Sequence, residues 1–381
     1  MIGAGPVGLA AALGARERGC DVTVLEAADV GHGLRRWGPT RFFSPLVMNV
    51  TDAIRRCLGD SLPPGDALLT GPEFTERVLI PLAESWELRG TVRTGHRVSG
   101  VGRAGMTRME MAGHPVRAEK PFRVIAETAA GDRAFEADVV LDASGVTGLP
   151  CLLGAGGLPA RGERRFHERI LRDLGTLHER LSGLAGKVVL LVGHGHSAAG
   201  ALLALAELAG RDSSTRVIWA VRSGNRRPCV EVADDPLPER QRVAAGANDL
   251  AAAPPPFLDL QRWTSVEGLE ERGGRIAVAF GKNRHADVDA IVSLTGYRPD
   301  LRFLSELPLE ISPATEGAAR LSGALGNLTD CLAVPRVEPR DLESGEPGFF
   351  LVGSKSYGRS RSFLLQAGFA QLETILGLAA G

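Results

Sequence analysis

Cysteine is scarce in this chain of 381 residues, and the few that occur are scattered. The five positions are Cys20, Cys57, Cys151, Cys229 and Cys331. None of them belongs to a C-x-x-C pair, and none has the spacing of a metal site, so the sequence predicts neither an internal redox dithiol of that kind nor a metal cofactor. Unpaired, scattered cysteines are typical of a reducing cytosol.

An excess of one charge and long apolar runs are also missing. The chain carries 44 basic and 45 acidic residues, so its charge gives no reason to expect nucleic acid or a membrane as a partner. No run approaches the roughly 18 apolar residues of a membrane helix, and the opening stretch lacks the basic leader of a signal peptide. We therefore expect a cytoplasmic protein. Lysine is rare too, with four in the chain, which draws attention to Lys355.

What the sequence does have is a strand, a glycine turn, a helix and a second strand in the middle of the chain. The apolar run from Val188 to Val192 predicts a buried parallel strand. Gly193, Gly195 and Ala198 follow as G-x-G-x-x-A, and the next strand ends on Arg222. In such a turn the small residues allow a tight reversal, close approach of a pyrophosphate, and packing of the helix on the strand.

The start of the chain repeats this pattern. Gly3, Gly5 and Gly8 precede an apolar helix, and the strand after that helix ends on Glu26. A carboxylate at this point accepts hydrogen bonds from ribose hydroxyls, whereas the guanidinium of Arg222 suits a 2′-phosphate. The first site therefore predicts FAD or NAD, and the second predicts NADP.

The first unit begins with an unusually short strand. Only Met1 and Ile2 precede Gly3, although such a unit usually opens with a strand of about five residues. If this strand is truly cut short, we expect weak retention of the flavin.

A loop rich in glycine, arginine and aromatic residues runs from Gly31 to Val50 and contains no cysteine. We expect the loop as a whole to line the site. Candidates for shaping a substrate or oxygen pocket are Trp37, Arg41, Ser44 and Asn49. Each of them taken singly can also be a residue that packs the loop on the sheet.

The remaining pattern is weaker. Residues 51–88 predict two helices around a Pro-Pro-Gly turn, and residues 223–256 predict a flexible polar connection. Strands are expected at Val92 to Val101, Phe122 to Glu127, Ala134 to Leu141, Arg262 to Gly268, Arg275 to Phe280, Asp287 to Thr295 and Phe349 to Val352. Arg226 and Arg227 are either further phosphate ligands beside Arg222 or a solvated basic turn.

One expected strand ends on Ser144 and Gly145, where bare backbone can lie against a bound nucleotide, although a chance loop glycine would give the same pattern. Thr295 and Gly296 end a second strand, and Gly353 follows a third. The helix expected after Ser362 would point its N-terminus at the ligand.

Together these patterns predict an α/β fold with two Rossmann-like dinucleotide-binding domains, the second inserted in the first. The expected FAD-binding domain comprises residues 1–184 and 299–381. The expected NADPH-binding domain comprises residues 185–298.

The paired glycine motifs, the SLTGYRPD segment and the terminal LVGSKSYGR resemble flavoproteins of the pyridine nucleotide-disulfide oxidoreductase superfamily. Across nearly the whole chain, the sequence looks like the flavin-containing monooxygenase and CzcO-like branch. The resemblance implies that Gly3, Gly5, Gly8 and Glu26 hold FAD, and that Gly193, Gly195, Ala198 and Arg222 hold NADPH. Further candidates for binding a cofactor are Pro6, Val7, Trp37, Ser144, Gly145, His196, Ser197, Thr295, Gly296 and Gly353.

Two features depart from that family. Many relatives carry Gly-Asp at the last strand end, where the Asp binds the flavin ribityl chain, but here Ser354 and Lys355 follow Gly353. The F-x-G-x-x-x-H signature of many monooxygenases is also missing before the second glycine motif.

The implied reaction is hydride transfer from NADPH to FAD, followed by oxygen activation and attack on a small-molecule substrate. Candidates for managing oxygen are Arg41, Asn49, Lys355 and Tyr357, whereas His194 and His196 are expected to be turn residues. Two other functions stay open. One is a flavin reductase that passes electrons to a protein or disulfide acceptor, and the other is a non-catalytic nucleotide-binding sensor. The sequence does not indicate the oligomeric state.

Overall fold

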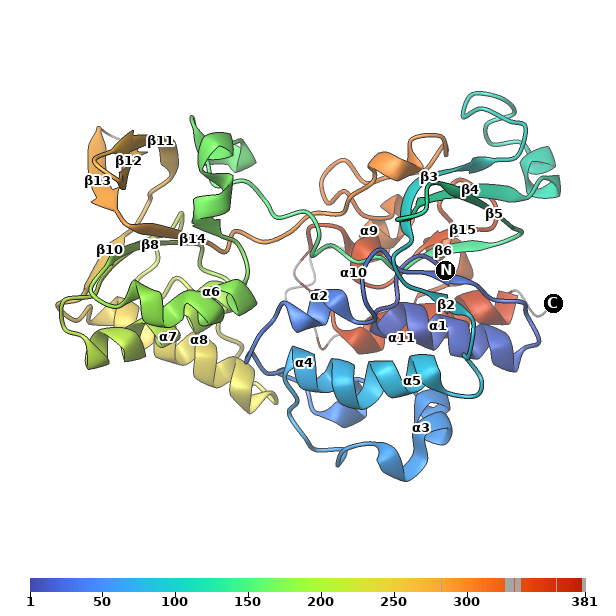
Figure 1. Ribbon diagram of the computed structural model, residues 1–381, viewed down its shortest axis with the longest axis horizontal. Helices are drawn as coiled ribbons and strands as arrows, with labels where there is room; N and C mark the ends of the chain where they lie inside the picture. Colours follow the sequence, from blue (N-terminus) through green and yellow to red (C-terminus); the bar gives the residue numbers. More distant parts are fainter. Residues whose placement is uncertain (282, 326–331, 333–336, 361, 379–381) are drawn as a thin grey trace.

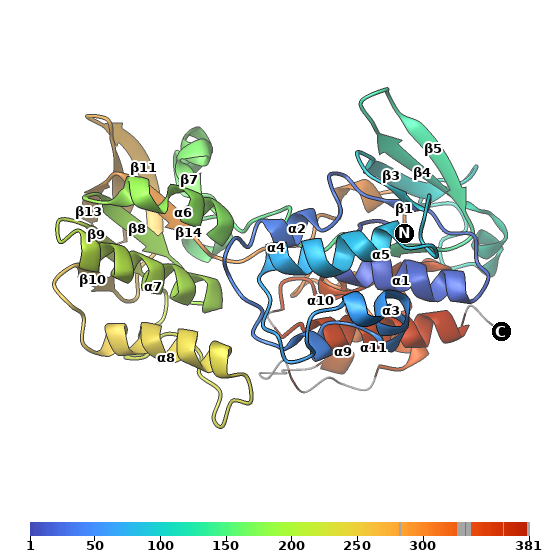
Figure 2. The ribbon, with the colours of Figure 1, turned by 60° about the horizontal axis from the view of Figure 1, so that its bottom comes forward.

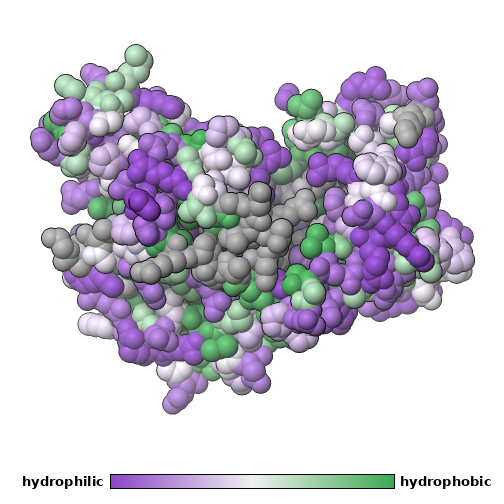
Figure 3. Space-filling view, turned by 180° about the vertical axis from the view of Figure 1, so that it is seen from behind, coloured by the Kyte–Doolittle hydropathy of each residue, from purple (hydrophilic) through white to green (hydrophobic). Residues whose placement is uncertain are grey.

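The computed structural model describes residues 1–281, 283–325, 332, 337–360 and 362–378, so Cys331 lies outside the described residues. The chain forms two lobes (Figure 1). The first unit contains the helices near both ends of the chain, and the second unit is built from the middle of the sequence. Seen from behind, a notch separates the two lobes along the upper edge (Figure 3).

Short parallel strands form the centre of the first unit. They are β1 (Val24–Leu25), β2 (Val92–Arg93), β6 (Val140–Asp142) and β15 (Phe349–Leu351). β1 pairs with β2, and β15 pairs with β6. Ile2 makes parallel bridges to both Leu25 and Asp142, so it occupies the position of the opening strand between β1 and β6.

Helices cover one face of this sheet. They are α1 (Pro6–Glu17), α2 (His32–Arg35), α3 (Asp52–Leu58), α4 (Gly71–Phe74), α5 (Ile80–Glu84) and α11 (Leu365–Leu378). Two shorter helices, α9 (Ala319–Leu325) and α10 (Ser354–Tyr357), instead bury side chains in the core on the opposite face. A π-helical segment, Thr75–Leu79, joins α4 to α5, and the two helices expected within residues 51–88 are thus confirmed. α1 and α11 lie side by side, since a Cβ at Gly14 would be 2.6 Å from Leu376 (Figure 2).

An antiparallel sheet covers the other face of the first unit. It consists of β3 (Arg97–Arg103), β4 (Phe122–Glu127) and β5 (Arg133–Ala137). Glu346 accepts hydrogen bonds from Arg103 at 2.6 Å and from Arg117 at 2.8 Å, and all three side chains are buried. These ion pairs attach the connection between β3 and β4 to the segment that leads into β15.

The second unit has a five-stranded parallel sheet in the order β10-β9-β8-β14-β7. Its strands are β7 (Ile170–Leu171), β8 (Val188–Val192), β9 (Arg216–Ala220), β10 (Leu258–Gln261) and β14 (Ala290–Ser293). One face carries α6 (Leu174–Arg180), α7 (His196–Arg211) and α8 (Pro238–Ala252), and the other carries β11 (Val266–Arg272), β12 (Arg275–Phe280) and β13 (Arg284–Val288) (Figures 1 and 2).

The prediction of a flexible connection over residues 223–256 was wrong. The second half of this segment is the 15-residue helix α8, which begins with Pro238 in its first turn. Val243, Ala244 and Ala247 are buried in the core shared with α7. Proline is well suited to the first turn of a helix, because the missing N–H would have no partner there. The polar composition of the exposed face concealed this narrow apolar stripe.

Several predicted strands have different limits in the structure. The strand expected at 92–101 is divided between β2 and β3, which belong to different sheets, and the one expected at 134–141 is divided between β5 and β6. The insertion was expected to begin at residue 185, and that boundary stays a prediction. The pairing of β7 with β14, and of Gly154 with Val266, favours an earlier start near Cys151.

Candidate functional site

The first glycine turn leaves room for a phosphate at the start of α1. Gly3 has a φ of 97°, and a Cβ there would lie 2.9 Å from the Ala143 carbonyl oxygen. A Cβ at Gly8 would lie 2.0 Å from the Gly3 carbonyl oxygen, so only glycine allows α1 to pack on the turn. At the N-cap residue Gly5, by contrast, no atom lies within 4 Å of the position of a Cβ. Exposed N–H groups and the helix dipole favour an anion at this open position.

The second glycine turn repeats this geometry at the start of α7. Gly193 has a φ of 125°, and a Cβ there would lie 2.3 Å from the Leu294 carbonyl oxygen. The N-cap Gly195 again has open space where a Cβ would be, and its φ and ψ of −84° and 179° match the −86° and −175° of Gly5. Ala198 is fully buried behind the turn, whereas Ser197 is exposed at the helix start. Both turns therefore fit the pyrophosphate of a dinucleotide.

Glu26 follows β1 and lies beside the first turn. Its carboxylate accepts hydrogen bonds from the backbone N–H of Ala4 at 2.7 Å and of Ala28 at 2.9 Å. A carboxylate offers about four lone-pair sites, so these two bonds orient the group and leave capacity for ribose hydroxyls. Pro6 occupies the first helical position of α1, and Val7 is buried directly behind it.

Arg222 follows β9 at the equivalent place in the second unit. It is exposed, and within the described part of the chain its side chain makes no hydrogen bond or ion pair. Arg226 is exposed as well. Arg227 differs, because its guanidinium binds Glu231 at 2.8 Å and Asp249 at 2.9 Å. The structure therefore leaves Arg222 and Arg226, but not Arg227, available for a 2′-phosphate.

The predicted backbone turns lie next to the glycine turns. A Cβ at Gly3 would be 2.9 Å from the Cα of Ser144, and a Cβ at Gly353 would be 3.2 Å from Val7. Gly145 has a φ of 69° and stands in the same turn as Ser144. In the second unit, Thr295 donates to the Cys151 carbonyl at 3.0 Å, and the Gly296 carbonyl accepts from the Cys151 N–H at 2.8 Å.

Lys355 forms a buried ion pair with a residue that the sequence analysis did not single out. Its Nζ lies 2.7 Å from Asp142 Oδ2, and neither side chain is exposed. Lys355 also donates to the Ser144 hydroxyl at 2.9 Å, and that hydroxyl donates to Asp142 Oδ1 at 2.7 Å. The Nζ lies 4.4 Å from the centre of the Phe303 ring. Its contacts thus fix the turn behind Gly3 and favour a structural role over oxygen chemistry.

Tyr357 lies on the same short helix as Lys355. It is 1% exposed, its ring packs 5.3 Å from that of Phe363, and burial raises its pKa to about 12. The phenol therefore keeps its proton throughout the neutral range. The structure brings Lys355 and Tyr357 together on α10, but no described hydrogen bond or ion pair links either residue to Arg41 or Asn49.

The loop from Gly31 to Val50 holds its predicted site residues mostly by internal contacts. The Asn49 amide donates to the Ser44 and Pro45 carbonyls at 2.9 and 3.1 Å and accepts from the Ser44 hydroxyl at 2.9 Å. This use of the whole amide favours a structural role for Asn49. Trp37 packs 4.9 Å from the Phe42 ring. Arg41 is exposed and donates to the Leu68 carbonyl at 2.9 Å.

The same loop contacts both glycine turns. At its start, the Gly31 N–H donates to the Ala4 carbonyl at 3.1 Å, inside the first turn. Further along, the Phe43 ring stands edge-on to the ring of His196, with 5.2 Å between the centres, at the start of α7. The expectation that this loop lines the site is therefore supported at both ends.

A second set of contacts joins the same loop to the second unit. Arg36 binds Asp173 at 2.7 Å, and the Gly175 N–H donates to the Arg36 carbonyl at 3.0 Å. Gly38 and Gly175 approach so closely that a Cβ at Gly38 would be 2.8 Å from the Gly175 Cα. Burial opposes ionisation of Asp173, but hydrogen bonds from Thr176 and Arg36 outweigh it and lower the pKa of this carboxyl. The sequence analysis missed these residues, because nothing local marks a contact across 137 positions.

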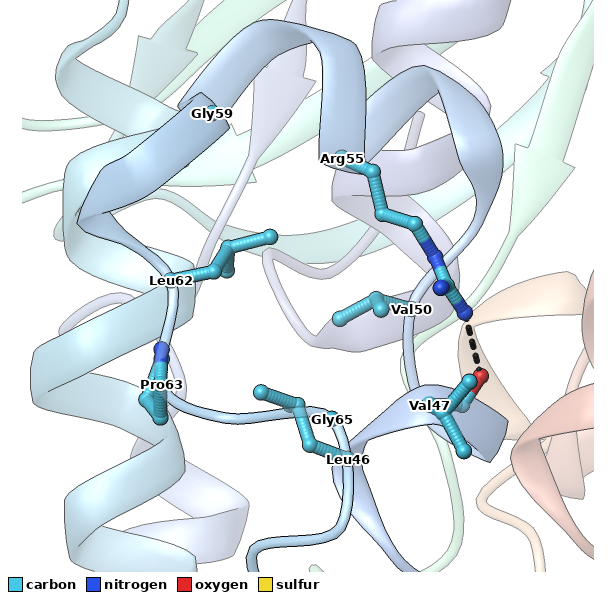
Figure 4. A pocket seen from close by; sticks show the side chains of 8 residues that line it. All are labelled: Leu46, Val47, Val50, Arg55, Gly59, Leu62, Pro63 and Gly65. Atoms are coloured by element: carbon cyan, nitrogen blue, oxygen red, sulfur yellow. Dashed lines mark hydrogen bonds between the residues drawn. The ribbon is translucent and has the colours of Figure 1, made fainter.

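A pocket of about 280 Å³ opens elsewhere in the first unit, between residues 46–50 and 55–65 (Figure 4). Leu46, Val50 and Leu62 line it, and Arg55 donates to the Val47 carbonyl at 2.7 Å at its edge. None of its lining residues belongs to a glycine turn. In the described residues we find no helix able to cross a membrane and no group of three potential metal ligands.

Two glycine turns with matching geometry, one beside a carboxylate and one beside a guanidinium, define a dinucleotide-dependent flavoenzyme of the two-domain class. The model of the pyridine nucleotide-disulphide oxidoreductase family matches residues 1–318. The chain belongs to that family. It is an FAD-dependent oxidoreductase, and its cofactors are FAD and NADP(H).

Solved structures agree with this fold. The bacillithiol disulfide reductase Bdr of Bacillus cereus is 18% identical, with a TM-score of 0.69 over 100% of this chain and 97% of that one. A flavin monooxygenase variant from Stenotrophomonas maltophilia is 19% identical, with a TM-score of 0.63 over 100% and 96%. The ornithine N-hydroxylase of Kutzneria sp. 744 is 15% identical, with a TM-score of 0.63 over 100% and 97%. No curated protein matches the sequence.

Proposed function

We propose that this chain is an NADPH-dependent flavin monooxygenase that acts on a small molecule, close to the flavin-containing monooxygenase and CzcO-like branch. The main support for this proposal comes from the loop between Gly31 and Val50. It touches both glycine turns and contains no cysteine. Electrons that reach the flavin then have no dithiol in this loop to enter, and we infer that oxygen accepts them directly.

Residues of the chain supply binding and orientation. The first turn and Glu26 hold the pyrophosphate and ribose of FAD, and the second turn and Arg222 hold those of NADPH. When bound, FAD supplies the redox chemistry by accepting hydride and reducing oxygen. The Asp142–Lys355 pair keeps the Ser144 turn against Gly3. Arg41 is the exposed cation of the loop and remains our candidate for a group that touches the substrate.

A second candidate function is the direct reduction of a disulfide or a protein carrier. It is favoured by the family itself and by the TM-score of 0.71 with the bacillithiol disulfide reductase of Staphylococcus aureus. Among the described residues Cys20, Cys57, Cys151 and Cys229 are all free thiols, so such a reaction would proceed without an internal pair of these residues. The family consists of oxidoreductases, which argues against the non-catalytic sensor.

The two candidates differ in what accelerates NADPH oxidation. A monooxygenase consumes NADPH and oxygen in equal amounts, and its release of hydrogen peroxide falls when an amine or sulfide substrate is added. A disulfide reductase oxidises NADPH without oxygen once a low-molecular-weight disulfide is present. Oxygen-electrode and absorbance measurements on the purified protein with FAD test this directly. Anaerobic turnover driven by bacillithiol disulfide or glutathione disulfide would overturn the monooxygenase proposal.

A cytoplasmic location and a small-molecule substrate belong to this proposal. The reductase alternative would add a protein electron acceptor as the partner.

A further inference from the structure

Trp263 is an exposed aromatic residue in a backbone conformation that such residues avoid. Its φ is 52°, and 75% of its surface is exposed. The left-handed region costs free energy for a bulky side chain, and exposure of an indole forgoes hydrophobic stabilisation. Neither cost is recovered by packing in the core. Backbone strain of this kind is found most often at sites that bind ligands.

The position of Trp263 in the sheet places it beside Arg222. β10 runs parallel to β9 with Gln261 opposite Ala220, and each of these residues lies two positions before Trp263 or Arg222. The Thr264 N–H donates to the Val221 carbonyl at 3.0 Å, which extends the pairing past the end of β10. Ligands of open α/β sheets bind at the carboxyl ends of the strands. Trp263 and Arg222 therefore share the edge at which a nucleotide binds.

The indole is held in place on one side by the loop that follows Arg222. A Cβ at Gly224 would lie 2.1 Å from Cε2 of Trp263, so the ring rests directly on the Gly224 backbone. Arg262 fastens the same loop, because it donates to the carbonyls of Asn225 and Arg226, both at 3.0 Å. The ring is thus supported from behind, while most of its surface faces solvent.

We propose that Trp263 is the platform on which the adenine of NADPH stacks. This inference rests on the proposed NADPH site at Arg222. A flat, electron-rich indole offers a π-face to a purine and tolerates any base, whereas the guanidinium next to it reads the 2′-phosphate. The two residues therefore contribute different parts of recognition. Trp263 adds affinity for every adenine dinucleotide, and Arg222 discriminates between NADPH and NADH.

Calorimetric titration of the full-length protein with adenosine 2′,5′-bisphosphate tests the platform without any redox chemistry. Trp263→Ala should weaken binding of this probe about tenfold, as expected for the loss of one aromatic stacking partner. Trp263→Phe should recover most of the affinity. Trp86→Ala is the matched control, because Trp86 is 81% exposed and lies in the first unit. It should leave the affinity unchanged.

A ratio of affinities separates the platform from the phosphate contact. Trp263→Ala should weaken NADPH and NADH by the same factor, whereas Arg222→Ala should weaken NADPH alone. A preferential loss of NADPH in Trp263→Ala would overturn the stacking role, because it would mean that the indole acts through the phosphate.

Thermal unfolding separates a binding role from a structural one. Asparagine tolerates a positive φ, so Trp263→Asn should leave the unfolding midpoint unchanged or raise it while affinity for the probe falls. A lowered midpoint together with unchanged affinity would overturn the proposal and make Trp263 a packing residue. If the wild-type protein fails to bind the probe, the proposed NADPH site is itself wrong, and the stacking role of Trp263 is wrong as well.

Discussion

The two glycine turns have nearly the same backbone, yet their surroundings differ. Around the first, Lys355 and Asp142 form a buried ion pair, and Gln371 accepts from the Gly353 N–H at 2.9 Å and donates to Ser356 at 2.9 Å. Around the second, Arg222 is exposed and free of protein partners in the described part of the chain. From this difference we expect a resident cofactor at the first turn and an exchanging one at the second.

This contrast follows from the physical chemistry of burial. A site enclosed by satisfied polar groups on rigid elements holds its ligand in one geometry, which suits a flavin that stays bound through many turnovers. An exposed guanidinium exchanges water for phosphate at little cost, which suits a nucleotide that must enter and leave in each cycle.

Loss of the buried lysine should damage the first site most. Lys355→Met leaves the Asp142 carboxylate buried without a counter-charge, so we expect the free energy of unfolding to fall by about 3–5 kcal/mol and FAD to be lost. Denaturant unfolding and the ratio of flavin to protein absorbance measure both effects. Lys120→Met removes an exposed lysine and should change neither.

The double variant Asp142→Asn/Lys355→Met sharpens this prediction. Because it leaves no unpaired charge, it should recover a large part of the lost stability. If Lys355→Met alone keeps its flavin and its stability, the enclosure of the first site is not what holds the cofactor.

Removing the charge of Arg222 or of Glu26 should weaken the binding of one cofactor only. Arg222→Ala removes a charge-assisted contact and should weaken NADPH by about 1.5–3 kcal/mol, with little effect on NADH. Glu26→Gln should instead lower FAD affinity and leave NADPH binding unchanged. Titration of both variants with each dinucleotide is the measurement. Equal losses of NADPH and NADH in Arg222→Ala would remove that residue from the phosphate site.

A methyl group at the N-cap glycine of each turn should block the pyrophosphate without disturbing the fold. Both positions have open space for a Cβ, so Gly195→Ala should weaken NADPH by about 1–3 kcal/mol through crowding, and Gly5→Ala should weaken FAD similarly. Gly200→Ala is the control within α7, since its Cβ also meets open space but lies away from the turn. Normal affinities in both N-cap variants would show that neither turn touches a phosphate.

The contact at Gly175 should control how well the two sites face each other. A Cβ there would lie 2.6 Å from the Arg36 carbonyl oxygen, so Gly175→Ala should push the units apart and slow flavin reduction about tenfold without weakening NADPH. Rapid mixing under anaerobic conditions measures the rate. In Gly183→Ala the Cβ meets no atom within 4 Å, and this control should behave as wild type. An unchanged rate in Gly175→Ala would mean that this contact does not determine how closely the two cofactor sites approach each other.

Acid should loosen this contact slightly. Despite burial, hydrogen bonds from Thr176 and Arg36 lower the pKa of Asp173 in the folded chain, so these contacts stabilise the fold above the ordinary pKa of aspartate, and their contribution is lost as the pH falls through the lowered value. Arg36→Gln should reduce the acid dependence of the unfolding midpoint. Arg35→Gln is matched to it, because Arg35 binds Glu76 within the first unit at 2.6 Å, and it should keep the wild-type dependence. The same loss in both variants would argue against a specific pair.

The sequence predicted the glycine turns and their flanking strands, because a buried strand, a tight turn and a helix start leave local signatures. It did not predict the partners of Lys355 or Asp173, since these lie 213 and 137 positions away and only the folded chain brings them together. α8 did carry a signal in Pro238 and its buried alanines, but polar residues outnumbered them. Asn49 looked catalytic because the sequence does not reveal that its amide is hydrogen-bonded to Ser44 and Pro45 within the loop.

The proposed function requires that electrons pass from an exchanging NADPH to a resident FAD. The most direct measurement is anaerobic mixing of the protein, gel-filtered beforehand to remove free flavin, with increasing NADPH while flavin absorbance is followed. We predict that the flavin stays with the protein and is reduced at a rate that saturates with NADPH. Flavin that separates from the protein on the column, or that stays oxidised at saturating NADPH, would contradict the account.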